Sequence, residues 1–340
     1  MQPEIRILGL GTHLPGPLVS NEELAPRLGM DADSLRRDTG IEGRHFTPSG
    51  EGPSDLAVVA ARSALAAADT TVDDLGLMIF ATTTPDVAFP GAACFLQEKL
   101  GVPTIGALDI RAQSAGFVAG LDLAAGFCAE VQADGSADAR YRRVLLATGE
   151  VFASGLDFSP AGREMAGRLA DGAAVAIVGP GDQGPRLLGA RWYTDGTLIE
   201  SFWTEVARSS KVAGRVTRED IEEGRHFPHA DLPSLRAVAA TRMAEVAREV
   251  AEIAGFTCSE AARVLIDYIE PDVAEAVAAE LGIATGKLVV PTAKFGHIMT
   301  AGLAIALADV LPELVAGDKV LLVAAGSGFT WGAAALEVGR

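Results

Sequence analysis

The same order of predicted elements occurs twice along this chain of 340 residues. An apolar run at 75–83 is followed by Pro-Asp-Val and by a helical stretch that ends in Leu-Gly. The apolar run at 263–269 is followed by the same three residues and by a helical stretch with the same ending. Each copy continues with a turn, an apolar helix and a further strand. Strands that alternate with helices predict mostly parallel sheets, so the sequence indicates an α/β fold built from two duplicated halves.

We place the first half at residues 1–178 and the second at 179–340. The pattern breaks at about 196–236, which we interpret as an inserted or mobile segment over the site. This segment contains an acidic run, a stretch rich in His and Pro, and the basic residues Arg208, Lys211, Arg215 and Arg218. Two facing halves predict a functional site at their junction.

The charge balance excludes one large class of partners. The chain has 28 basic and 45 acidic residues, a formal net charge of −17. Nucleic acids bind basic surfaces, so this balance argues against a nucleic-acid partner. No apolar run reaches the ~18–20 residues of a membrane span, and the N-terminus enters a strand without a basic region and an apolar core. We therefore expect a cytoplasmic protein that binds neither nucleic acid nor membranes.

The three cysteines, Cys94, Cys128 and Cys258, do not have the spacing of a metal site. Cys94 and Cys128 lie in apolar helical runs. We expect buried free thiols in a reducing compartment. We expect no metal and no other cofactor.

Ser114 is the most informative residue for function. It lies in Asp-Ile-Arg-Ala-Gln-Ser-Ala-Gly-Phe, between an extended run at 101–110 and an apolar helix predicted at 116–131. A residue at a strand-to-helix junction exposes its side chain at the positive end of the helix dipole. A serine at a helix start is more often only an N-cap, so Ser114 needs further context.

Motifs in other parts of the chain supply that context. They are Ala-Thr-Thr-Thr at 81–84, Ala-Phe-Pro-Gly-Ala-Ala-Cys at 88–94, Asp-Gly-Ala-Ala at 171–174 and Ala-Gly-Ser-Gly-Phe-Thr-Trp-Gly at 325–332. With these motifs in this order, the chain resembles the type III β-ketoacyl carrier-protein synthases over nearly its whole length. The resemblance implies a thiolase-like five-layered αβαβα fold and a homodimer. It places Phe89 near the partner's acyl pocket and Phe329 among the substrate-binding residues.

The catalytic Cys, His and Asn of that family are all replaced. Local matching places Ser114 at the Cys position, Asp267 at the His position and His297 at the Asn position. A helix N-terminus can lower the pKa of Cys enough to give thiolate, whereas Ser needs a neighbouring base and an orienting acceptor. We expect His297 to take the Ser114 proton and Asp267 to fix the ring tautomer. The oxyanion donors would be the N–H groups of Ser114 and, by resemblance, Ser327.

The exchanged residues predict acyl transfer without carbon–carbon bond formation. In the family, His and Asn donate hydrogen bonds to the thioester carbonyl during decarboxylation, and an ionised Asp267 cannot donate. Ester-forming members that tailor polyketide antibiotics carry Asp and His in the same exchanged arrangement. The resemblance therefore implies transfer of a small acyl group, malonyl-type or other, through Ser114 to a hydroxyl acceptor such as a sugar of a polyketide. If Ser114 stood in place of a native Cys, the Asp and His would still indicate acyl transfer, because a Cys-His-Asp triad supports the same reaction.

The identity of the thioester donor stays open. The family holds the coenzyme A adenine between a Trp and an Arg; Arg163 matches the Arg, but Ser34 stands at the Trp position and Asp38 replaces an adjacent Arg. The helix after Asp267, where the family docks acidic carrier protein, is itself acidic. Carrier protein would then dock on the basic segment 208–218, or the donor is of another kind.

Two alternatives compete with the acyltransferase. A hydrolase or thioesterase is one, because Ser, Asp and His follow the chain order of α/β-hydrolases, although the motif around Ser114 lacks one Gly and the C-terminal glycine-rich loop favours the thiolase fold. An inactive partner subunit of a condensing heterodimer is the other. The intact Ser, His and Asp set argues against it. Partitioning of the acyl-enzyme between water and alcohol separates transferase from hydrolase.

Overall fold

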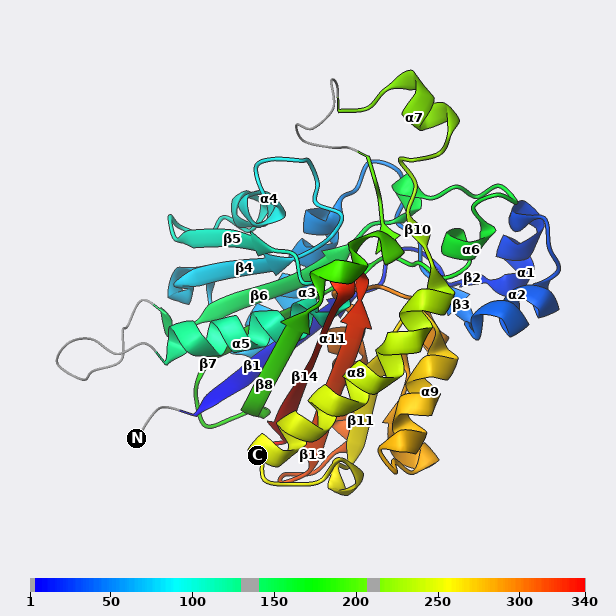
Figure 1. Ribbon diagram of the computed structural model, residues 1–340. Coiled ribbons are helices and arrows are strands. Elements are labelled where there is room, and N and C mark those ends of the chain that lie inside the picture. Colours follow the sequence, from blue (N-terminus) through cyan, green and yellow to red (C-terminus); the bar gives the residue numbers. More distant parts are fainter. Residues whose placement is uncertain (1–3, 130–140, 207–214, 340) are drawn as a thin grey trace.

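The computed structural model describes residues 4–129, 141–206 and 215–339 (Figure 1). Ten strands form the main sheet in the order β12-β11-β13-β14-β8-β1-β7-β6-β4-β5. Its first five members along the chain are β1 (Ile5–His13), β4 (Leu77–Ala81), β5 (Gly106–Ile110), β6 (Val144–Glu150) and β7 (Gly172–Pro180). Its last five are β8 (Arg186–Thr194), β11 (Arg263–Asp267), β12 (Leu288–Val289), β13 (Lys319–Gly326) and β14 (Thr330–Glu337).

The strand order is the same in both halves when each is followed outward from the centre. The first gives β1-β7-β6-β4-β5 and the second β8-β14-β13-β11-β12, and the two join through the pairing of Arg6 with Arg186. In each half two strand pairs are parallel and two are antiparallel. The prediction of mostly parallel sheets was therefore wrong for the inner strands. The pair β13–β14 must run antiparallel, because only residues 327–329 join the two strands and a parallel pair needs a crossover of a dozen residues or more.

Among the described residues, six helices cover the two halves of the main sheet, which act as two separate β layers, so that there are five layers in all. Residues at alternate positions of β7 and β13 face opposite sides, as the two-residue period of a strand requires. One side of each strand packs on the central helices α5 (Gly116–Cys128) and α11 (Gly302–Val310). The other side packs on α3 (Pro53–Ala67) and α4 (Ala92–Leu100) in the first half, and on α8 (Leu232–Ile253) and α9 (Pro271–Glu280) in the second. The predicted thiolase-like αβαβα fold is confirmed.

The central helices differ in composition from the outer ones because both of their faces are covered. Nearly every residue of α11 is buried, and α5 is rich in Gly and Ala, so that two sheets can approach it closely. A Cβ on Gly120 would overlap the side chain of Leu146 in β6. The long outer helix α8 has polar residues on its solvent face, and Asp231 caps it by accepting a hydrogen bond from the N–H of Ser234.

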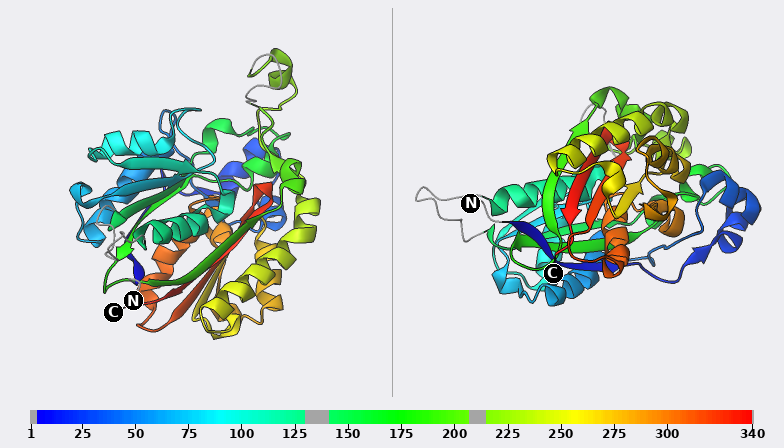
Figure 2. Two further views of the ribbon diagram at one scale, coloured as in Figure 1. Left: turned by 60° about the vertical axis from the view of Figure 1, so that its left-hand side comes forward. Right: turned by 90° about the horizontal axis from the view of Figure 1, so that it is seen from below.

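The segment predicted at 196–236 connects β8 to α8, as residues 14–52 connect β1 to α3 in the first half. The first connection contains β2 (Val19–Ser20), α1 (Asn21–Leu24), α2 (Ala32–Thr39) and β3 (Gly43–Arg44). The second contains β9 (Phe202–Trp203), α7 (Arg218–Glu222) and β10 (His229–Ala230), and α7 projects from the body of the molecule (Figure 2). The segment ends earlier than predicted, because α8 already begins at Leu232. Arg208 and Lys211 lie outside the described residues.

Several other boundaries differ from the sequence-based ones. The extended run before Ser114 forms a strand only from Gly106, and α5 ends at Cys128, while position 131 lies outside the described residues. Cys94 was predicted to be buried but is exposed, because it lies on the outer face of α4. Within the described ranges no helix is both long and apolar enough to cross a bilayer.

Close packing of β1 on α3 gives the first prediction. A Cβ on Gly11 would overlap the backbone carbonyl of Ala60 in α3, and backbone cannot move aside as a flexible side chain can. Gly11→Ala should therefore lower the free energy of unfolding by about 1–3 kcal/mol. Gly126 is the matched control: it is exposed in α5 with open space around it, so Gly126→Ala should raise stability by about 0.5–1 kcal/mol. Chemical denaturation measures both, and equal effects would contradict the packing described here.

Candidate active site

The three predicted catalytic residues come from different elements and converge at one buried point. Ser114 lies in the short 3-10 turn Gln113–Ala115 between β5 and α5. Asp267 is the last residue of β11, and His297 lies in the loop between α10 (Pro291–Phe295) and α11. All three side chains have 0% exposure. Sites in α/β proteins commonly form at the carboxyl ends of parallel strands, and this one does so where the two halves meet.

The distances connect these residues in a chain. Ser114 Oγ lies 3.2 Å from His297 Nε2. His297 Nδ1 lies 3.6 Å from Asp267 Oδ1, which is too long for a hydrogen bond. The Thr292 hydroxyl lies between the last two, donating to Asp267 Oδ1 at 2.6 Å and lying 3.3 Å from His297 Nδ1. The structure therefore brings the predicted residues together and adds Thr292, which sequence reasoning missed.

Backbone contacts fix the position of His297. Its N–H donates to the carbonyl of Arg168 at 2.8 Å, and its carbonyl accepts from the N–H of Ala170 at 3.1 Å. The preceding Gly296 has φ of +76°, and a Cβ there would lie 2.7 Å from Ala170 Cβ. Glycine is thus required before His297, both by conformation and by space.

The C-terminal glycine-rich loop touches Ser114 directly. A Cβ on Gly326 would lie 2.5 Å from Ser114 Oγ and 3.0 Å from its backbone nitrogen. Only glycine permits this approach, since a larger residue would displace the hydroxyl. The next residue, Ser327, lines the neighbouring cavity. The approach places the residue before Ser327 against Ser114, so that the two residues predicted to supply oxyanion donors lie in adjoining parts of the site.

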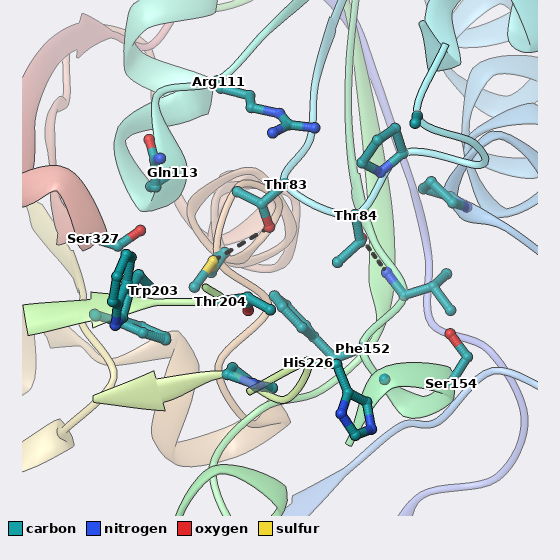
Figure 3. Close-up of a pocket in the computed structure, with 18 of the residues that line it drawn as sticks. Thr83, Thr84, Arg111, Gln113, Phe152, Ser154, Trp203, Thr204, His226 and Ser327 are labelled. Atoms are coloured by element: carbon teal, nitrogen blue, oxygen red, sulfur yellow. Dashed lines mark hydrogen bonds between the residues drawn. The ribbon is translucent and has the colours of Figure 1, made fainter. Parts of the chain in front are cut away.

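A cavity of about 750 Å³ adjoins the buried residues. Figure 3 shows Gln113 and Ser327 on one side of it, and Phe152, Ser154 and His226 on the other. Ser114 and His297 are not among the lining residues, but Gln113, next to Ser114, and Met299, two residues after His297, are; both have positive φ, +46° and +37°. Non-glycine residues adopt such φ values at a cost, and they concentrate at functional sites. The cavity has the size of a small-molecule site.

The predicted substrate-binding residues lie elsewhere. Phe89 is 74% exposed in the loop before α4. Arg163 is exposed at the start of α6 (Arg163–Ala166). Phe329 is 1% exposed and packs on Trp331, with 5.7 Å between the ring centroids. None of the three lines the cavity. Their predicted roles are therefore not supported by contact with it in a single chain.

Glu150, at the end of β6, is a buried carboxylate that sequence reasoning also missed. It accepts hydrogen bonds from the hydroxyls of Thr83 and Thr84, both at 2.8 Å, and from that of Thr300 at 3.0 Å. Burial raises the pKa of its carboxyl, and these hydrogen bonds oppose that effect. Glu150 thereby ties the cavity wall of the first half to the loop that carries His297. In the sequence, the run of three threonines at 82–84 was the one available indication of a buried acceptor such as Glu150.

Asp171, in the Asp-Gly-Ala motif, has a structural role. Its carboxylate accepts hydrogen bonds from the N–H of Thr47 at 2.7 Å and from that of Phe152 at 2.6 Å. Burial raises the pKa of this carboxyl as well. The motif thus anchors Phe152 in the cavity wall. Among the residues that the structure describes, no cluster of three or more His, Cys, Asp and Glu could hold a metal ion.

Comparison with known proteins agrees with this fold. Family models for 3-oxoacyl-[acyl-carrier-protein] synthase III match residues 108–196, and its C-terminal model matches 251–338, together more than half of the chain. The synthase III from Aquifex aeolicus is 29% identical, with TM-score 0.83 and coverage of 98% of this chain and 99% of the other. The enzyme from Pseudomonas aeruginosa is 27% identical, with TM-score 0.85 and coverage of 99% of both chains. This chain belongs to the synthase III family of acyl-transferring enzymes.

A third structure shares the fold at lower identity. The priming β-ketosynthase from the R1128 polyketide biosynthetic pathway is 23% identical, with TM-score 0.85 and coverage of 100% of this chain and 97% of the other. At this identity the similarity establishes the thiolase fold alone.

Thiol labelling tests the exposure of the three cysteines. Burial raises the pKa of the Cys128 thiol to about 12 and also raises that of Cys258, whereas Cys94 is exposed. At about pH 8 the two buried thiols stay protonated and shielded, and thiolate is the reactive form. A maleimide should therefore label Cys94 alone in the native protein and all three after denaturation, measured by intact mass. Cys94→Ser should remove the native labelling, and rapid native labelling of that variant would contradict the description.

Proposed function

We propose that this protein is an acyltransferase that moves a small acyl group from a thioester through an acyl-Ser114 intermediate to a hydroxyl acceptor. The observation that carries the proposal is the 3.2 Å contact between Ser114 Oγ and His297 Nε2, in a fully buried setting with Asp267 beyond the ring. A serine hydroxyl needs such a base, and the base needs an acceptor behind it.

The first half-reaction acylates Ser114. As Oγ adds to the thioester carbonyl, its proton passes to His297 Nε2. The oxyanion accepts hydrogen bonds from the N–H groups of Ser114 and Ser327. The carbon–sulfur bond then breaks, and Nε2–H returns the proton to the departing thiolate. The donor already carries the activated acyl group, so this step needs no cofactor.

The second half-reaction regenerates the serine. Nε2 removes the proton of the acceptor hydroxyl as its oxygen attacks the acyl-Ser114 carbonyl. Oγ leaves and takes that proton back, and the acceptor departs as an ester. The cavity beside Ser114 supports binding of a polar acceptor, because Gln113, Ser154, Thr204 and Ser327 offer neutral hydrogen-bonding groups.

The residues also support transfer over condensation. In a decarboxylative condensation the thioester enolate needs donors, and Asp267 occupies the position at which the family has His. A carboxylate there can only accept hydrogen bonds. We propose a malonyl-type or other small acyl group, with Arg111 at the cavity edge as a cation for a carboxylated one. Coenzyme A or acyl carrier protein carries it, and the acceptor is a hydroxyl such as that of a polyketide-linked sugar. We place the reaction in the cytoplasm.

Intact-mass spectrometry with a panel of acyl thioesters tests the chemistry. Wild-type protein should gain one acyl group, which an alcohol discharges. Ser114→Ala should gain none. His297→Ala should slow acylation by about 10³-fold or more, and Asp267→Asn by about 10²–10⁴-fold, because the wrong ring tautomer then faces Ser114.

Other outcomes of the same experiment would overturn the proposal. A carbon–carbon condensation product, or acylation that persists in Ser114→Ala, would contradict it. Discharge by water that is no slower than discharge by a saturating alcohol would indicate a hydrolase.

We also propose that the enzyme is a homodimer in which Phe89 acts at the partner's site. Two features support this: an aromatic ring that is 74% exposed, and β5, which forms an edge of the main sheet. Light scattering should give about twice the chain mass of 35.1 kDa. Ser114→Ala should be inactive and Phe89→Ala weakened, and mixed dimers should regain activity because Ser114 of one chain meets Phe89 of the other. A monomeric mass, or mixtures no better than Phe89→Ala alone, would contradict the arrangement.

A further inference from the structure

The Thr292 hydroxyl fills the gap between the proposed base and its acceptor. The direct separation of His297 Nδ1 and Asp267 Oδ1 is 3.6 Å, whereas Thr292 Oγ1 lies 2.6 Å from Oδ1 and 3.3 Å from Nδ1. All three side chains have 0% exposure, so no bulk solvent can replace this contact. Histidine and aspartate alone would leave Nδ1 without a close acceptor.

The direction of the hydrogen bonds follows from the chemistry of each group. An aspartate carboxylate only accepts, so the single hydroxyl proton of Thr292 points to Oδ1. The oxygen of Thr292 then presents lone pairs to Nδ1, which must carry the ring proton. Neutral imidazole has one N–H, so Nε2 is left with a free lone pair toward Ser114 Oγ. One hydroxyl thereby selects the tautomer in which His297 can act as a base.

The local backbone does not need this hydroxyl. Thr292 lies in the first turn of α10, where a hydroxyl could cap the helix. The N-cap residue is Val290, and no side chain makes a capping hydrogen bond at this helix end. The carbonyl of Thr292 accepts from the N–H of Gly296 at 3.0 Å, which any residue could do. Asp267, for its part, has no described hydrogen-bond partner at Oδ2. Thr292 is therefore the one described donor that holds the carboxylate in place.

We infer that Thr292 is a positioning residue that links Asp267 to His297, so that the hydrogen-bonded chain from Ser114 to Asp267 has four members rather than three. The inference rests on the proposed function of Ser114. When Nε2 takes the serine proton, Nδ1–H donates to Thr292 Oγ1 while Thr292 O–H donates to Asp267 Oδ1. The charge on the ring is stabilised through the intervening hydroxyl, and no proton moves to the carboxylate.

Two substitutions separate this role from simple packing. Thr292→Val keeps the shape and removes the hydroxyl, whereas Thr292→Ser keeps the hydroxyl and removes the methyl group. Single-turnover acylation, followed by intact mass, should be about 10–100-fold slower in Thr292→Val and within about threefold of wild type in Thr292→Ser. A packing role predicts the reverse order. Circular dichroism and thermal melting confirm that both variants fold.

A second measurement does not depend on substrate. Nitrogen-15 NMR of the ring nitrogens of His297, in the protein without thioester, should show the proton on Nδ1 in wild type and in Thr292→Ser. Thr292→Val should give a mixture of tautomers. If Thr292→Val keeps both the wild-type tautomer and the wild-type rate, the inference is wrong.

The double variant Asp267→Asn/Thr292→Val gives a further check. Because both residues would act through His297, its rate should match that of the slower single variant rather than the product of both losses. Multiplicative losses would show that Thr292 acts by another route. Failure of the proposed function is recognised separately, as acylation that does not require Ser114, and would leave the tautomer measurement valid.

Discussion

The contact between Ser114 Oγ and His297 Nε2 crosses between the two halves of the chain, and the rest of the site depends on it. Ser114 precedes α5 and His297 precedes α11, and the two helices contribute to one buried apolar cluster between the halves of the main sheet. Glu150 strengthens this junction by joining threonines of both halves. Close approaches by Gly326 and Gly296 then leave the two side chains little freedom to move.

The chemistry follows from exchanging a strong nucleophile for a weak one. A cysteine at a helix start reaches the thiolate form by electrostatics alone, and its neighbours are free to donate hydrogen bonds to substrate. A serine in the same place needs neighbouring side chains to remove its proton, so His297 and Asp267 would activate Ser114 and would not donate hydrogen bonds to the substrate carbonyl. The fold of the synthase III family is kept, while the residues at these three positions are the ones from which we propose acyl transfer without condensation.

Much of this could be predicted from sequence, for identifiable reasons. The duplicated order of runs around Pro-Asp-Val gave the α/β halves, and motifs at fixed spacing located Ser114, Asp267 and His297. Thr292 could not be found, because a single threonine five residues before His297 has no distinguishing pattern and its value lies in a distance across the fold. Glu150 follows an apolar strand and is recognisable only once the threonines around it are seen. Cys94 was predicted to be buried and is exposed, because an apolar run does not show which face of a helix is covered.

The repeated strand order has a consequence for how the two key residues relate to each other. Ser114 lies in the connection from β5 to α5, and His297 in that from β12 to α11, which is the equivalent connection of the other half. The centre is thus a meeting of two counterparts of one loop across an internal pseudo-twofold axis. Identical loops would present two nucleophiles or two bases to each other. Divergence between the copies, with hydroxyl on one and imidazole on the other, turns a symmetric contact into a complementary pair.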